Sequence, residues 1–205
     1  MKKLILSIAV LALAAISASA QINLEAGMSL GNYKYNNNFT SKPALNFGVS
    51  YDIFMGSAGG EDLFIEPGVR FVMKNAALTN ESNISLNLSW LEVPVYFGSS
   101  VDLGNFTLVG KVGIYYAYDL SQTVKQGDKT YNLFDGTVSN IISTLRGTDS
   151  VIIKRHDLGF TGAAMIYYNF IGVGVGYSYG LLNVANQSNS SAHTSCLTLN
   201  LGVRF

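Results

Sequence analysis

The sequence predicts an all-β protein, an eight-stranded antiparallel up-and-down transmembrane β-barrel. Three observations lead to this prediction. Apolar residues alternate with small or polar ones in eight segments, as in strands that have two unlike faces. The connections between the segments are short and long in turn, which is typical of outer-membrane barrels. The last segment ends on Phe205, an aromatic residue that suits a membrane interface.

The first 20 residues have the pattern of a signal peptide. Lys2 and Lys3 precede an apolar stretch from Leu4 to Ile16, and Ala18-Ser19-Ala20 offers the small residues that a signal peptidase accepts. The alternative, an N-terminal membrane anchor, is disfavoured because a spanning helix needs about 20 apolar residues. We therefore expect a signal peptide at 1–20 and an outer-membrane β-barrel domain at 21–205.

Composition narrows the classes of function. Charged residues are 13% of the chain and Gly is abundant, at 21 residues. Without Lys2 and Lys3 the chain has 11 basic and 13 acidic residues, and this formal charge of −2 gives no basic footprint for nucleic acid. Cys196 is the single cysteine, so it forms no internal disulfide and is expected to be a small packed residue.

The first four expected strands alternate apolar residues with small or polar ones, the fourth with one change of phase. Successive side chains of a strand point to opposite faces, so this pattern indicates a strand with one apolar side. In chain order the ranges, with examples of their apolar phase, are Ile22 to Tyr33 (Leu24, Ala26, Met28), Pro43 to Phe54 (Leu45, Phe47, Val49), Leu63 to Met73 (Ile65, Val69, Phe71) and Ile84 to Phe97 (Leu86, Leu88, Val95).

The last four expected strands follow the same rule. The seventh alternates apolar residues with glycine or serine, and we expect these small residues to relieve crowding inside the barrel. The four ranges are Phe106 to Leu120 (Leu108, Val112, Ile114), Asp157 to Tyr168, Ile171 to Leu181 (Val173, Val175, Tyr177) and Cys196 to Phe205 (Leu197, Leu199, Leu201).

The fourth strand changes phase within itself. Its apolar residues are even-numbered up to Trp90 and odd-numbered from Leu91 onward. One extra residue at Trp90–Leu91 would keep all of them on one face, and this predicts a β-bulge there.

Short and long connections predict the topology. We expect the short connections to lie in the periplasm with both termini, and the long ones to lie outside the cell. The short connections are Gly56 to Asp62, Ser99 to Asn105 and Asn169-Phe170, and the long ones are Lys34 to Lys42, Lys74 to Asn83, Ser121 to His156 and Leu182 to Ser195.

The loop from Ser121 to His156 is the longest connection, and connections of this length are usually functional or disordered. Val138 to Leu145 has apolar residues at helical spacing, which predicts a short amphipathic helix over the barrel mouth. Val151 to Ile153 is expected to extend the sixth strand and to pair with Thr123 to Lys125. The alternative is a solvated, variable loop without a binding partner.

Alternation alone does not tell which face points inward, and a soluble lipocalin-like barrel is the alternative. A soluble barrel should have an outer face rich in Lys and Glu, but the non-apolar face here has about one charge per strand. We therefore expect this face to line the lumen, where acids and bases pair. The expected lumen residues are Glu25, Asp52, Glu66, Arg70, Glu92, Lys111, Tyr115 and Arg204.

Aromatic residues gather near both ends of the strands, as they do in interface girdles. Those expected near the loops are Tyr33, Tyr35, Phe71, Trp90, Tyr116, Tyr118, Tyr177 and Tyr179, and those expected near the turns are Phe54, Phe64, Phe97, Phe106, Tyr168, Phe170 and Phe205.

Residues that could carry chemistry are few. His156 and Asp157 lie where the longest loop returns to a strand, and His193 and Ser195 lie in the last loop. Some outer-membrane barrels modify lipids with a His and a Ser or an acid, but two His in polar loops arise easily by chance. The spacings of a metal site are absent. We expect no catalytic, cofactor or metal site.

Several motifs resemble one family. Leu91-Glu92-Val93-Pro94-Val95, Ile65-Glu66-Pro67-Gly68-Val69, Tyr177 to Asn183 and Leu199 to Phe205 are similar to strands of the PorT-like outer-membrane β-barrel domain, the "porin family protein" of Gram-negative genomes. The sequence departs from the pattern at Gly98, where a basic residue is expected. The resemblance implies a barrel without a catalytic signature.

The sequence thus predicts a non-enzymatic integral protein of the cell outer membrane. It would present long extracellular loops for surface interaction, adhesion or envelope support, with a lumen filled by side chains and no large pore. The alternative is an accessory component of a protein secretion or assembly machine. Expected partners are outer-membrane lipid and lipopolysaccharide, the barrel-assembly machinery, and an extracellular ligand or envelope protein of unknown identity.

Overall fold

The structure, a computed structural model, describes residues 21–34, 39–78, 84–127, 129–132, 154–184 and 193–205. The expected signal peptide, the expected helix at Val138 to Leu145 and the segment Val151 to Ile153 lie outside these residues. No helix among them is both long and apolar enough to cross a membrane. The strands are β1 (Gln21–Lys34), β2 (Phe39–Ala58), β3 (Glu61–Leu78), β4 (Ile84–Asp102), β5 (Phe106–Gln126), β6 (Lys129–Asn132), β7 (His156–Tyr168), β8 (Ile171–Gly180) and β9 (His193–Arg204).

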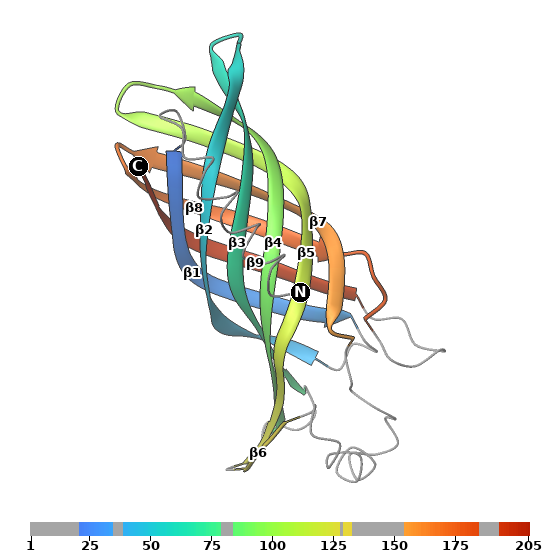
Figure 1. The fold of residues 1–205 in the computed structure, drawn as a ribbon. Helices are drawn as coiled ribbons and strands as arrows, with labels where there is room; N and C mark the ends of the chain where they lie inside the picture. Colours follow the sequence, from blue (N-terminus) through green and yellow to red (C-terminus); the bar gives the residue numbers. More distant parts are fainter. Residues whose placement is uncertain (1–20, 35–38, 79–83, 128, 133–153, 185–192) are drawn as a thin grey trace, which may run out of the picture.

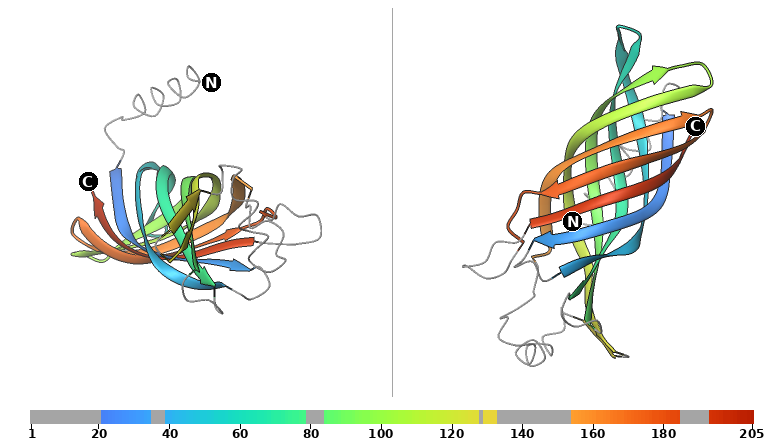
Figure 2. Two further views of the ribbon diagram at one scale, coloured as in Figure 1. Left: turned by 90° about the horizontal axis from the view of Figure 1, so that it is seen from below. Right: turned by 180° about the vertical axis from the view of Figure 1, so that it is seen from behind.

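Eight of these strands form a closed antiparallel ring. Each pairs with its neighbour in the chain, β5 pairs with β7, and β1 pairs with β9 to close the ring. The strands tilt strongly, and the rear view shows β7, β8, β9 and β1 side by side (Figures 1 and 2). The remaining described strand, β6, pairs with Thr123 to Gln126 at the end of β5 and lies outside the ring. The predicted fold class is confirmed, with one added strand.

Most strands are longer than the sequence predicts, because they continue into the connections, whereas β8 ends one residue earlier than expected. β2 and β3 run on to a turn at Gly59 and Gly60, whose φ values of 64° and 90° suit glycine. β7 and β8 are joined by a tight turn in which Asn169 has a φ of 54°. We call the end with the connections 59–60, 103–105 and 169–170 the turn rim, and the opposite end the loop rim.

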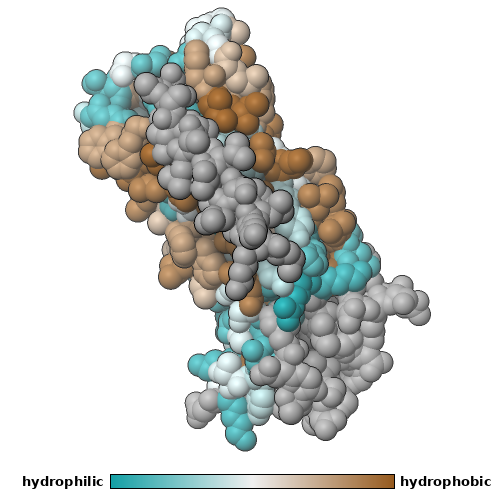
Figure 3. Space-filling model, in the orientation of Figure 1, coloured by the Kyte–Doolittle hydropathy of each residue, from teal (hydrophilic) through white to brown (hydrophobic). Residues whose placement is uncertain are grey.

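The outer surface carries a broad apolar band. Side chains of this band are 38–68% exposed, although they are large and hydrophobic. Figure 3 shows this brown band across the middle of the barrel, with teal hydrophilic residues towards both ends. An apolar outside around a polar inside is the arrangement that a lipid solvent favours, and it excludes the soluble lipocalin-like alternative. Members of the band include Leu24, Leu45, Phe47, Val112, Ile114, Phe160, Val175 and Leu201.

The predicted bulge at Trp90–Leu91 is wrong. β4 keeps one phase throughout, with Leu88, Trp90 and Glu92 all fully buried. The irregularity is in the partner strand, where Ser89 pairs with Ser121 and Trp90 with Asp119, so that Leu120 is the extra residue. The apolar residues of this strand change sides because, towards the loop rim, β4 turns Leu86, Leu88 and Trp90 inward and its serines and asparagine outward.

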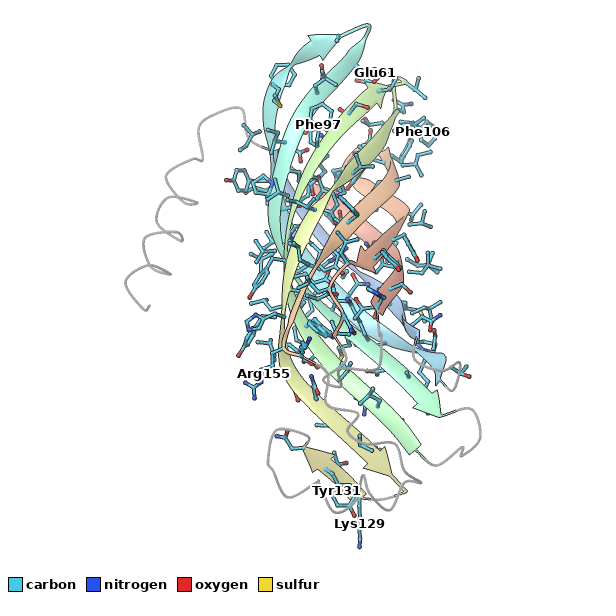
Figure 4. All side chains as sticks on the ribbon, turned by 90° about the vertical axis from the view of Figure 1, so that its right-hand side faces the viewer. Glu61, Phe97, Phe106, Lys129, Tyr131 and Arg155 are labelled. Carbon is cyan, nitrogen blue, oxygen red and sulfur yellow. The ribbon has the colours of Figure 1, made fainter. Side chains whose placement is uncertain are left out.

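Most described members of the predicted aromatic girdles face outward and two do not, whereas Tyr35 lies outside the described residues. Tyr116 and Tyr177 are exposed near the loop rim, and Phe97, Phe106 and Tyr168 are exposed near the turn rim. Figure 4 shows Phe97 and Phe106 near that end. Trp90 and Phe64, however, are buried inside the barrel.

Candidate functional site

Lys111 of β5 is the centre of the charged lumen. Its Nζ lies 2.7 Å from Glu25 Oε1 and 2.8 Å from Glu66 Oε1, although these residues come from strands far apart in sequence. Asn200 donates a hydrogen bond of 3.0 Å to Glu25, and Ser50 donates one of 2.5 Å to Glu66. Two buried carboxylates thus share one ammonium, and each also accepts a hydrogen bond from a neutral donor. Buried charges require such partners.

A second cluster lies beside the first, towards the loop rim. Glu92 is fully buried and accepts from Arg70 at 2.6 Å, and Lys74 Nζ lies 3.0 Å from its other oxygen. The Lys74 ammonium also lies 5.3 Å from the ring centre of Trp90 and 5.6 Å from that of Tyr115. The lumen positions predicted for Arg70, Glu92 and Tyr115 are therefore confirmed, as are those of Glu25, Glu66 and Lys111.

Arg204 and Asp52 form a third pair at the turn rim, 2.7 Å apart. They line an open cavity of about 270 Å³ together with Asp62 and Asp102. Beneath this cavity four apolar side chains pack across the lumen: Phe64, Val109, Met165 and Tyr167. The sequence predicts the charges at this end but not the apolar layer, because Phe64 is expected in the outer girdle.

The lumen is also filled near the loop rim. Asp157 is fully buried, and it accepts hydrogen bonds from Tyr115 at 3.0 Å and from Thr194 at 2.5 Å. Trp90 and Leu88 are fully buried at this end. Asp157 therefore has the structural role of a lumen acid.

Of the residues that could carry chemistry, His156 and Asp157 point to opposite sides of the barrel wall. His156 faces outward and is exposed, where its Nδ1 bonds the Tyr116 hydroxyl, whereas the neighbouring Asp157 points into the lumen. His193 Nδ1 lies 3.2 Å from the Gly180 carbonyl oxygen, and its ring stacks on Tyr179. Within the described part of the chain, no three His, Cys, Asp or Glu side chains are grouped as metal ligands would be.

Exposed charges are sorted by sign between the two rims. In the described ranges every exposed acidic residue lies at the turn rim, and every exposed basic residue lies at the loop rim. Figure 4 shows Glu61 at one end and Lys129 and Arg155 towards the other. The acidic residues are Glu61, Asp62 and Asp102, and the basic ones are Lys42, Lys125, Lys129, Lys154 and Arg155.

An aromatic and cationic cluster lies on the outer surface at the loop rim. The His156 ring lies 5.9 Å from that of Tyr116 and 5.2 Å from that of Tyr118, between centroids. Arg155 NH1 donates to the Tyr118 hydroxyl at 3.4 Å, and its side chain projects away from the barrel (Figure 4). The sequence predicts the two tyrosines at an interface. It does not predict the cation beside them, because Arg155 precedes the predicted strand.

One wall of the barrel extends past the loop rim. β5 continues to Gln126, and its residues Thr123 to Gln126 pair with Lys129–Asn132 of β6 on one edge and with β4 on the other. The expected pairing of Thr123 to Lys125 with Val151 to Ile153 is therefore wrong, because both edges of β5 are already taken. The hairpin that takes that place is visible beyond the barrel in Figure 1.

Comparison with known proteins agrees with this geometry. The sequence of residues 14–186 matches the model of the family described as "Outer membrane protein beta-barrel domain". No curated protein matches the chain in sequence.

Among solved structures, the outer membrane enzyme PagL is similar with a TM-score of 0.54 at 10% identity, over 87% of this chain and 98% of PagL. Ail, the attachment invasion locus protein of Yersinia pestis, solved with the heparin analogue sucrose octasulfate, has a TM-score of 0.47 at 11% identity, over 91% of this chain and 99% of Ail. Neisserial surface protein A has a TM-score of 0.45 at 9% identity, over 91% of this chain and 97% of that one. At such identities only the fold is shared.

Proposed function

The chain belongs to the outer-membrane β-barrel domain family, and from this premise we propose that it is a non-enzymatic surface protein of the outer membrane. Its loop rim would face the outside of the cell, and the connections there would bind an extracellular ligand or envelope partner. Within the family we place it with the PorT-like members, on the strand motifs around Glu66 and Glu92.

The observation that carries the proposal is the content of the lumen. Most of its charged side chains are buried and bind one another, so they face neither a solute nor a substrate. The sorting of exposed charge in the described ranges supports the orientation, because the exposed charges described at the loop rim are basic and suit the anionic outer surface of such a membrane. What remains available for function is the loop rim.

Protease added to intact cells tests this orientation. Trypsin should cut the region between β5 and β7, where Lys129, Lys154 and Arg155 are exposed, and it should leave the strands of the ring whole. A protease that cuts after glutamate is the matched control, because Glu61 is exposed at the turn rim and should be reached only after the outer membrane is opened. Cleavage at Glu61 in intact cells, with the tryptic sites protected, would invert the topology and end the proposal.

Purified protein in a planar lipid bilayer should show no large steady conductance. The physical reason is that the lumen of an eight-stranded barrel is just wide enough for its own side chains, and here it holds a layer of Phe64, Met165 and Tyr167 besides the ion pairs. A known large porin in the same bilayer serves as the control. Long-lived openings of porin size would contradict the filled lumen.

A further inference from the structure

Glycine is distributed unevenly between the two faces of the barrel. Apart from Gly56 at a bulge, the glycines of the described strands share the phase of the lumen residues, with two exceptions, Gly110 of β5 and Gly162 of β7. These two face the lipid side and are neighbours, because Gly110 pairs with Ala164 and Val112 pairs with Gly162. Three small residues therefore adjoin one another on a surface made mostly of large apolar side chains.

Internal packing does not explain the two outward glycines. A Cβ at Gly110 would meet nothing within 4 Å, and one at Gly162 would make ordinary contacts of 3.4 and 3.5 Å. At the inward Gly113, by contrast, a Cβ would lie 2.1 Å from the Val95 carbonyl oxygen. Neither outward glycine has a positive φ. Glycine weakens a strand unless something approaches closely, so the explanation must lie outside the barrel.

The small residues form the floor of an open hollow of about 1000 Å³ on the lipid-facing surface. Phe160 and Tyr177 stand at its sides. A second hollow of about 670 Å³ shares Ala164 and Val175 with the first and continues towards Leu108 and Leu201. Together they make an apolar groove across β5, β7, β8 and β9, within the band that lipid covers.

The groove lies directly below the aromatic and cationic cluster. The outward residues of β7 run from Gly162 through Phe160 and Leu158 to His156. Six residues of strand span about 20 Å, which at a tilt of about 40° is a depth of about 15 Å. This is half the thickness of a hydrocarbon core, about 30 Å. The floor of the groove is thus one leaflet below His156, and the Arg155 guanidinium lies at the depth of lipid headgroups.

From this juxtaposition we infer that the barrel binds one phosphorylated, multiply acylated lipid of the outer leaflet. One acyl chain fills the hollow above Gly110 and Gly162, and a headgroup phosphate binds Arg155, whose planar donors match phosphate oxygens. In the described ranges no exposed acid lies at this rim to oppose the phosphate. The inference rests on the proposed orientation, with the loop rim outside.

The test is native mass spectrometry of the purified full chain in detergent, with bisphosphorylated hexa-acylated lipid A as the probe. The wild type should retain one lipid A. Gly110→Leu fills the hollow and Arg155→Glu reverses the charge, and each should weaken binding about tenfold. The matched controls are Ala26→Leu, which enlarges an exposed small residue on the lipid side of β1, and Lys129→Glu, which reverses a loop-rim charge on β6. Both controls should bind lipid A as the wild type does. Lipid A without phosphates should bind the wild type weakly, about as weakly as intact lipid A binds the Arg155→Glu variant.

If Gly110→Leu fails to assemble, Ala164→Leu fills the same hollow from an exposed alanine position. Equal lipid retention by every variant would overturn the inference, and so would binding that ignores the phosphates. A dimer of the chain that Gly110→Leu disperses would also overturn it, because a second copy would then be the occupant. If the wild type retains no lipid A but trypsin cuts intact cells as expected, this inference alone is rejected. If intact cells are cut at Glu61 and the tryptic sites are protected, the proposed function is rejected as well.

Discussion

Replacing Lys111 with methionine should destabilise the barrel by about 3–5 kcal/mol, the cost of leaving buried charges without their partner. The substitution keeps the length of the side chain but removes the ammonium that lies 2.7 and 2.8 Å from Glu25 and Glu66. Both carboxylates are more than four-fifths buried, so solvent cannot replace the lost partner. Urea unfolding in detergent, followed by the heat-modifiable gel shift of the folded barrel, measures the loss.

Two further variants make the result specific. Lys129→Met removes a lysine that is exposed on β6, and it should leave the unfolding midpoint within about 0.5 kcal/mol of the wild type. Adding Glu66→Gln to Lys111→Met should restore part of the stability, because one stranded charge is removed. An unchanged midpoint in Lys111→Met, or no recovery in the double variant, would show that the three charges are not coupled as described.

The second large effect is expected at Gly113, where valine should impair assembly while valine at Gly110 should not. A Cβ at Gly113 would lie 2.1 Å from the Val95 carbonyl oxygen and 2.8 Å from the Tyr96 Cα. These are backbone atoms of the paired strand, so β4 and β5 would have to separate locally. We expect a cost of at least about 1–3 kcal/mol, as for overpacking of a core.

Gly110→Val is the matched control because it introduces the same residue on the same strand. Its Cβ enters open space, and valine favours strands, so its stability should equal or exceed that of the wild type. The amount of folded, heat-modifiable barrel in the membrane fraction measures both variants. Equal amounts for the two would mean that the closeness of β4 to β5 at Gly113 does not limit folding.

The ring and its inner face could be predicted because both follow from alternation. Within the lipid-facing part of each strand, alternation tells which side chains share a face, and a closed ring of eight such strands has one lipid side. The lumen positions of Glu25, Glu66 and Lys111 could therefore be assigned without coordinates. Which acid pairs with which base could not, since partners such as Lys111 and Glu25 come from strands that are remote in sequence.

The predictions fail where the barrel passes from lipid into water. Leu86, Leu88 and Trp90 look like outward residues if lipid is assumed along the whole strand, and a bulge in β4 is then needed to explain Leu91 and Val93. Beyond the membrane the solvent is water, so apolar side chains turn inward and the sides exchange without any bulge in β4. The change of phase at Trp90–Leu91 marks the height at which the solvent changes, but alternation alone does not distinguish such a change from a bulge. The cluster around Arg155 could not be predicted for a related reason, because charged residues next to the end of a strand have the composition of a loop.

The seam between β1 and β9 determines the order of assembly. Most other seams join neighbours in the chain and can form as hairpins, but this one pairs Asn23 with Arg204 and Lys34 with His193. A contact between such distant residues carries the largest loop-closure entropy in the ring, so we expect it to form last. Until then two long strand edges stay open, which is the condition under which sheets aggregate. We therefore expect the chain to need a holding factor on its way to the membrane, and we expect a mutation that slows the closure of this seam to prolong that need without changing the finished barrel.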